Sequence, residues 1–83
     1  MTPEQAFSQV LRKVRKEKCV SQNNLALQCH LDRTYISLLE RGLRQPSLRT
    51  ILQIALALDV SPSNLIFQVE KLLDANQEKH NSD

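Results

Sequence analysis

The stretch from Ser21 to Gly42, SQNNLALQCHLDRTYISLLERG, constrains the fold of this chain more than any other part of it. Its pattern predicts two short helices, at about residues 21–29 and 32–41, joined by a tight turn. Ser21 and Asp32 are residue types that accept the free backbone N–H groups at the start of a helix. The apolar positions of the stretch predict the buried side of this pair: Leu25, Ala26, Leu31, Ile36 and Leu39.

The helix over residues 32–41 has two chemically different sides. At about 100° per residue, Ile36 and Leu39 fall together on one side, which predicts its contact with the core. The opposite side carries two guanidinium groups, two hydroxyls and one apolar tip, from Arg33, Thr34, Ser37, Leu38 and Arg41. Groups of these kinds can contact base edges and phosphates, and the DNA major groove is wide enough to admit a helix.

The same residues carry a resemblance to a known family. The strings LDRTYISLLERG and QPSL resemble the helix-turn-helix of the lambda repressor and Cro-like (XRE) family, and the resemblance covers about residues 10–65. The length of the chain and the LDRTYIS string are similar, more narrowly, to the small controller proteins of restriction–modification systems. The resemblance implies a compact lambda-repressor-like domain that binds double-stranded DNA through its second and third helices.

Four residues of the third helix are the candidates for reading base edges. We expect Arg33 to be the main reader, because arginine pairs bidentately with guanine O6 and N7. Thr34 and Ser37 can bond to base edges or phosphate, and Leu38 can pack on a thymine methyl group. Tyr35 lies on the border between core and groove, and for this residue core packing and DNA contact stay equally open.

A second set of residues is expected to contact the phosphate backbone, which positions a protein without reading sequence. The resemblance implies a phosphate contact for Gln22. Asn23 follows it, and backbone N–H groups at a helix start also favour phosphate. Arg41, Arg44 and Gln45 come at the end of the third helix and after it, and are further candidates. The alternative for these residues is simple exposure to solvent.

The resemblance also implies an ion pair between Arg15 and Glu40. A bidentate pair of this kind would tie the first helix to the third and fix its angle. Cys19 and His30 stand where the family usually has glycine. A left-handed residue is less favourable as cysteine than as glycine, so we expect strain or a different shape at Cys19. Histidine tolerates positive φ better than most residues.

Positive charge is concentrated in the same part of the chain. Between Arg12 and Arg49 there are nine basic and three acidic residues, a net charge of +6, and the rest of the chain has a net charge of −4. The basic part suits a polyanion, and the acidic remainder would repel one. Helical surfaces are often charged for solvation alone, but the overlap with the two-helix stretch favours a nucleic-acid partner.

The chain predicts an all-α fold in a single domain, residues 1–83. It has one glycine and no long β-rich run. We expect five helices, at about residues 4–18, 21–29, 32–41, 47–58 and 62–74, followed by a frayed tail at 75–83. The helix at 47–58 is apolar over most of its circumference, which predicts burial on more than one side.

A homodimer is expected, because a core this small is marginal and a partner subunit would bury more apolar surface. We expect the fourth and fifth helices to carry the contact. Phe67 lies off the apolar stripe of the fifth helix, where an exposed aromatic would suit a partner. The residues assigned to the dimer contact are Ile54, Leu65, Ile66, Phe67 and Val69.

Other classes of protein fit the sequence poorly. No apolar run approaches the ~20 residues of a membrane span and no signal peptide is recognisable, so we expect a soluble cytoplasmic protein, nucleoid-associated when bound to DNA. Cys19 and Cys29 are expected to be free thiols, with one disulfide as the minority alternative, and no metal site is expected. The sequence offers no glycine-rich phosphate loop and no paired carboxylates, so we expect no enzyme, no cofactor and no small-molecule ligand.

These observations favour a homodimeric, sequence-specific transcriptional regulator of a near-palindromic site with half-sites about one helical turn apart. The sharpest version is a controller of restriction–modification genes, with a contact to RNA polymerase as a further expectation. A phage-type repressor and an antitoxin-like regulator are alternatives of the same class. The rival from another class is a protein-interaction module with the same fold and no specific DNA binding. The operator sequence, and the choice between activation and repression, cannot be read from one helix face.

Overall fold

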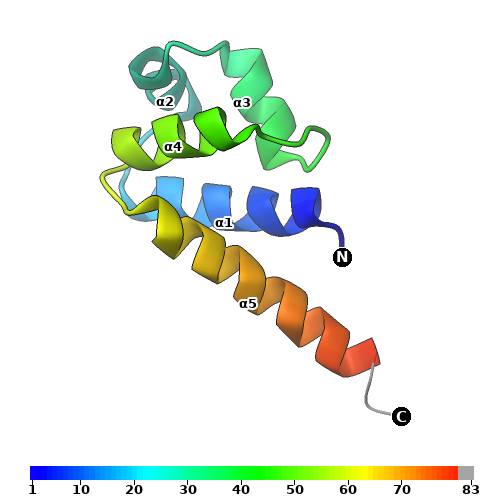
Figure 1. The fold of residues 1–83 in the computed structure, drawn as a ribbon. Coiled ribbons are helices and arrows are strands. Elements are labelled where there is room, and N and C mark those ends of the chain that lie inside the picture. Colours follow the sequence, from blue (N-terminus) through cyan, green and yellow to red (C-terminus); the bar gives the residue numbers. More distant parts are fainter. Residues whose placement is uncertain (81–83) are drawn as a thin grey trace.

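The computed structural model describes residues 1–80, with the side chains of residues 1–76, and this part of the chain forms five α-helices and no strand (Figure 1). The predicted all-α class is therefore confirmed. The helices are α1 (Pro3–Glu17), α2 (Gln22–Cys29), α3 (Arg33–Glu40), α4 (Leu48–Ala57) and α5 (Pro62–His80).

Hydroxyl side chains start four of these helices. The Oγ atoms of Thr2, Ser21, Ser47 and Ser61 each accept a hydrogen bond from the backbone N–H three residues later, at 3.0–3.2 Å. Each bond satisfies one N–H that has no partner inside its helix. Asp32 occupies the N-cap position of α3 as expected, but its side chain makes no capping hydrogen bond.

Left-handed residues end the first four helices. Cys19, His30 and Asp59 have φ values of 57°, 57° and 55°, and Gly42 has a φ of 72°. In each case the residue's N–H donates to the carbonyl three positions earlier, and the next N–H donates to the carbonyl five positions earlier. This is the Schellman motif, which satisfies the last carbonyls of a helix. Of the two outcomes expected at Cys19, the left-handed conformation is the one present, and His30 has positive φ as well. Asp59 is a further left-handed residue that is not glycine, and the sequence did not indicate it.

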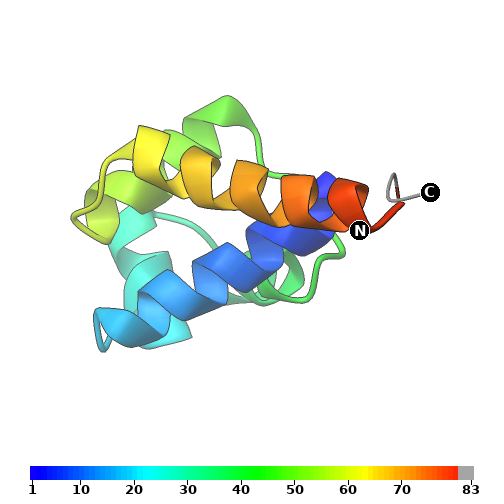
Figure 2. The same ribbon diagram turned by 90° about the horizontal axis from the view of Figure 1, so that it is seen from below.

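A single core fixes the relative positions of the helices. α1 packs against both α3 and α5, α2 packs against α3 and α4, and α4 packs against α5. Figure 2 shows α1 and α5 side by side along the face turned towards the viewer. The largest fully buried side chains are Leu11, Leu25, Ile36, Leu39, Ile54, Leu58 and Leu65. Every helix therefore contributes at least one apolar anchor to the same core.

α4 meets the other helices on more than one side, as expected, but its apolar surface is not buried all round. Leu48, Leu52 and Leu56 are 70 %, 48 % and 84 % exposed, whereas Ile54 and Ala55 are fully buried. α4 packs against both α2 and α5, so it is buried on the sides that meet these helices, and its remaining side faces solvent. The three exposed leucines are four residues apart and form one line along α4. We call this line the leucine ridge.

The prediction of a frayed tail from residue 75 is wrong for residues 75–80, because α5 continues to His80. Residues 81–83 of the predicted tail lie outside the described residues. Residues 75–79 contain good helix formers and neither proline nor glycine, so nothing local stops the helix. Asn76 Nδ2 donates to the carbonyl of Leu72 at 3.0 Å. The last turns of α5 stand away from the rest of the molecule (Figure 1).

By length and hydropathy, no single helix within the described residues qualifies as a membrane span. Only α4 together with residues 62–76 would qualify, and these two segments are bent by 112° where they join. That bend is the turn over residues 58–61, which folds α5 back onto α1 and α4.

Candidate nucleic-acid interface

The two faces of α3 differ in exposure as the sequence predicts. Ile36 and Leu39 are completely buried and anchor the helix in the core. Arg33 and Thr34 are exposed at its first turn. Ser37 and Leu38 are half-buried one turn later, so only part of each residue is accessible. The accessible side of α3 thus offers a guanidinium group and hydroxyls on a rigid support.

Tyr35 lies between these two faces. It is half-buried and packs against the core, so core packing, one of the two roles left open for Tyr35, is observed for its ring.

An ion pair holds α3 against α1. Arg15 Nε lies 2.5 Å from Glu40 Oε2, and Arg15 Nη2 donates to Glu40 Oε1 at 3.0 Å, which makes the pair bidentate. The third guanidinium nitrogen, Nη1, donates to the carbonyl of Val20 at 2.8 Å. The side chains of Arg15 and Glu40 are only 12 % and 3 % exposed. The pair that the resemblance implied is therefore present, and both of its side chains are largely buried.

Gln22 is a third member of this cluster. Its Nε2 donates to Glu40 Oε1 at 3.0 Å, so the carboxylate accepts hydrogen bonds from two helices at once. We call Arg15, Gln22 and Glu40 the clamp. The sequence assigned Gln22 to a phosphate contact, whereas in this structure its amide is bound within the protein. Asn23, the next residue of α2, is exposed.

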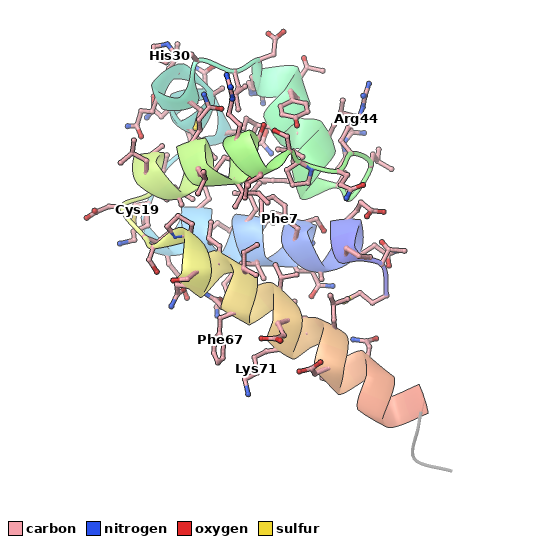
Figure 3. All side chains as sticks on the ribbon, in the orientation of Figure 1. Phe7, Cys19, His30, Arg44, Phe67 and Lys71 are labelled. Carbon is pink, nitrogen blue, oxygen red and sulfur yellow. The ribbon has the colours of Figure 1, made fainter. Side chains whose placement is uncertain are left out.

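The remaining phosphate candidates surround the end of α3. Arg41 is exposed, and its Nε donates to the carbonyl of Ser37 at 3.4 Å. Arg44 and Gln45 are exposed in the loop that follows. Figure 3 shows Arg44 projecting into solvent from this loop. The exposed cations of this region therefore lie next to the accessible side of α3.

The residues assigned to a dimer contact do not form one surface. Ile54 and Leu65 are fully buried in the core of the single chain, so their assignment to the contact is wrong. An apolar pattern shows that a helix has a buried side, but not which neighbouring helix or subunit covers it. Ile66 and Phe67 are 45 % and 53 % exposed, and Val69 is half-buried. The sequence did not reveal the leucine ridge, because a helix that is apolar over most of its circumference gives no sign of which of its leucines face solvent.

The two cysteines are both free, with Cys19 exposed and Cys29 buried. Burial raises the pKa of the Cys29 thiol above its ordinary value. In the part of the chain that the structure describes, no three His, Cys, Asp or Glu side chains lie close enough together to hold a metal ion.

A small helical bundle that presents cationic and hydroxyl groups on one rigid helix, preceded by a second helix and a tight turn, has the architecture of a helix-turn-helix DNA-binding protein. The family model described as "Helix-turn-helix" (HTH_3) matches residues 11–65. The chain therefore belongs to the helix-turn-helix family of DNA-binding transcriptional regulators.

Its relatives include controller proteins. The chain is 48 % identical over 61 residues to the control protein C.BamHI of Bacillus amyloliquefaciens. The matched region covers 72 % of this chain and 75 % of that protein. It superposes with a TM-score of 0.73 and 45 % identity on the restriction–modification controller protein C.AhdI of Aeromonas hydrophila, over 75 % of this chain and 94 % of that one.

A further similar structure is a complex with DNA. It is the restriction–modification controller protein C.Esp1396I, solved as a tetramer with its natural 35-base-pair operator. The TM-score is 0.77 and the identity 34 %, over 86 % of this chain and 93 % of that one.

Proposed function

We propose that this protein is a controller of restriction–modification genes, which binds a near-palindromic operator as a homodimer and places one α3 in the major groove at each half-site. The observation that carries this proposal is the accessible side of α3, held by two buried anchors and the clamp, in a chain similar to a controller protein solved on its operator. The protein acts by occupying DNA in the cytoplasm and nucleoid, and by contact with RNA polymerase.

Arg33 is the main base reader in this proposal. It is exposed at the first turn of α3, where an arginine can reach guanine O6 and N7 with both ends of its guanidinium group. Thr34 and Ser37 donate to base edges or phosphates, and the accessible part of Leu38 packs on a thymine methyl group. Because Leu38 and Ser37 are half-buried, only DNA that approaches α3 closely can meet them.

Phosphate contacts position α3 on the DNA. Asn23, Arg41, Arg44 and Gln45 are exposed on both sides of the reading helix, and the hydroxyl of Tyr35 is a further donor. Gln22 contributes through its backbone N–H at the start of α2, because its side-chain amide already donates to Glu40. The clamp therefore sets the position of a phosphate donor as well as the angle of α3.

The homodimer contact is proposed on the leucine ridge and Ile66. The ridge is a straight line of three exposed leucines, and two such lines can pack antiparallel across a two-fold axis. Ile66 lines a small groove together with Pro46 and Ile51. Because Ile51 lies one helical turn from Leu48, this groove places Ile66 near the start of the leucine ridge. Phe67 lies about 100° further around α5 and projects on the side away from α4 (Figure 3), so it does not belong to this contact.

The test is binding to the DNA upstream of the protein's own gene, measured by gel shift and footprinting over a range of salt concentrations. Arg33→Ala is expected to weaken operator binding by about 1–3 kcal/mol, roughly 5- to 150-fold, and to relax preference at one base pair of each half-site. Arg44→Ala is expected to weaken binding to all sequences and to reduce the salt slope by about 1. Lys71→Ala, on the far side of the molecule, is the control and leaves binding unchanged.

Two results would overturn parts of this proposal. Protection that is unchanged by Arg33→Ala would remove its assignment as the main reader. Absence of any salt-sensitive DNA binding would favour a protein-interaction module instead. The neighbouring genes give an independent check, because a methyltransferase gene and an endonuclease gene beside this one are expected for a controller and not for a phage-type repressor or an antitoxin-like regulator.

A further inference from the structure

A groove of about 420 Å³ runs between α1 and α5. It is lined by two kinds of residue, apolar ones at the floor and polar or cationic ones at the rims: Gln9, Val10, Lys13, Gln68, Lys71 and Leu72. Val10 is 3 % exposed and Leu72 is half-buried, so they form the floor, while Lys13 and Lys71 stand exposed on opposite rims. The volume lies within the range of clefts that bind ligands, roughly 300–1,000 Å³.

This groove is separate from the proposed DNA and dimer surfaces. α1 packs against α3 on one side and against α5 on another, so the α1–α5 groove is separated from α3 by the body of α1. Gln68 and Ile66 line grooves on opposite edges of α5. In Figure 3, Phe67 and Lys71 lie at the far side of the molecule from Arg44 and His30. A subunit bound to DNA and to a second copy would therefore leave the groove open.

The two rim lysines are held by uncharged groups. Lys13 Nζ donates to Gln68 Oε1 at 3.1 Å, and Lys71 Nζ lies 5.2 Å from the centre of the Phe67 ring. Within the described side chains, neither lysine forms a salt bridge. Both contacts orient the ammonium groups without neutralising them, so the rims keep their positive charge.

The surroundings of the groove add to this charge. Arg12 and Lys16 are exposed on the same helix as Lys13 and extend the cationic rim along α1. The acidic neighbours are Glu17, at the last position of α1, and two exposed residues of α5, Glu70 and Asp74, about 100° and 60° around the helix from Lys71. These three carboxylates are outnumbered by the four cations Arg12, Lys13, Lys16 and Lys71. The groove thus combines an apolar floor with a net positive border.

We propose that the α1–α5 groove docks an acidic amphipathic helix of a partner protein. Its apolar side chains would pack on Val10 and Leu72, and its carboxylates would pair with Lys13 and Lys71. An amphipathic helix in an apolar groove is a common mode of peptide recognition. A nucleic acid would match the charge of the rims but has no aliphatic side chains to cover the floor, so the combination favours a protein segment.

The test uses the full chain labelled with ¹⁵N and a synthetic helical peptide with leucines on one face and glutamates on the other. The expected result is saturable shifts of the amide signals of Val10, Lys13, Gln68 and Leu72, which bracket the groove. Two matched peptides serve as controls, one with every glutamate changed to glutamine and one with every leucine changed to serine. Both are expected to bind roughly tenfold more weakly or not at all, because each lacks one half of the required chemistry.

Charge reversal of the groove provides the second arm. Lys13→Glu/Lys71→Glu is expected to abolish the peptide-induced shifts while leaving the far-ultraviolet circular dichroism spectrum and operator binding unchanged. Arg41→Glu/Arg44→Glu carries the same change in charge on another surface and is expected to keep peptide binding. If only Arg41→Glu/Arg44→Glu loses operator binding, the result supports the proposed DNA surface and the separation of the groove from it.

Three outcomes would overturn the inference. The first is that no groove amide shifts with the acidic amphipathic peptide. The second is equal binding of the leucine-free acidic peptide, which would reduce the groove to a site of simple charge attraction. The third is that a DNA duplex shifts the groove amides, or that Lys13→Glu/Lys71→Glu loses operator binding, because either would make this surface part of the nucleic-acid interface.

Discussion

Replacing Arg15 with methionine tests how the reading helix is held. Methionine keeps the length and helix propensity of the residue but removes the guanidinium group. Arg15 supplies two of the three hydrogen bonds that the Glu40 carboxylate accepts, and it also donates to the carbonyl of Val20. The substitution therefore leaves a carboxylate that is 3 % exposed with the Gln22 amide as its remaining hydrogen-bond donor.

The expected loss follows from this burial. Removing one partner of a buried ion pair destabilises a protein by about 3–5 kcal/mol, because the other charge stays buried. The Arg15 side chain is 12 % exposed, so some water reaches the pair and the lower end, about 3 kcal/mol, applies. In a domain of this size that corresponds to a fall in Tm of roughly 12–24 °C. Thermal and urea unfolding, followed by circular dichroism, measure both quantities.

The double variant Arg15→Met/Glu40→Leu is the matched control. It removes both charges, so no buried carboxylate is left without a partner, and most of the lost stability is expected to return. Operator binding is expected to stay weak in this variant, since the clamp no longer fixes the angle of α3. A loss below 1 kcal/mol for Arg15→Met would refute the stability argument. Wild-type operator affinity in the folded double variant would refute the positioning role.

Further predictions concern the helix ends, the ridge and the thiols. Cys19→Gly is expected to raise the free energy of unfolding by about 0.5–1 kcal/mol, since relief of the left-handed conformation outweighs the entropy of glycine. Lys18→Gly is the control: Lys18 has a φ of −86°, so the substitution is expected to lower the free energy of unfolding by a similar amount. Equal effects of the two substitutions would contradict the reasoning. Leu52→Glu is expected to give folded monomers in sedimentation experiments, whereas Leu27→Glu, also at an exposed leucine, leaves the dimer intact; a dimeric Leu52→Glu would move the contact elsewhere. Burial raises the pKa of the Cys29 thiol, so less thiolate forms at a given pH, and iodoacetamide near pH 8 is expected to label Cys19 in the folded protein and Cys29 only after unfolding.

The features that depend on residues a few positions apart could be predicted from the sequence. Hydroxyl caps act on an N–H three residues away, so Ser21, Ser47 and Ser61 mark helix starts in the chain itself. The left-handed ends at Cys19 and His30 are equally local, although they came from the resemblance and not from residue type. The end of α5 was missed because polar residues alone do not stop a helix; a glycine or a proline would have given a clearer signal.

The candidate site was predicted in part. The spacing of Ile36 and Leu39 alone separates the buried side of α3 from its accessible side, because burying both anchors turns the opposite side of this short helix towards solvent. The pairing of Arg15 with Glu40 spans 25 positions, and no local pattern gives it; the family resemblance did. The bond from Gln22 to the same carboxylate was not predicted, because it depends on how closely α2 and α3 approach.

The chain itself determined the five helices, the orientation of α3 and the concentration of positive charge around it, because each follows from the order of neighbouring residues. The assembled bundle decided which apolar residues are core and which are surface. Ile54 and the leucine ridge belong to one apolar helix, and only the positions of the surrounding helices bury one and expose the other. The physical reason is that burial is a property of what a side chain packs against, and those partners come from distant parts of the sequence.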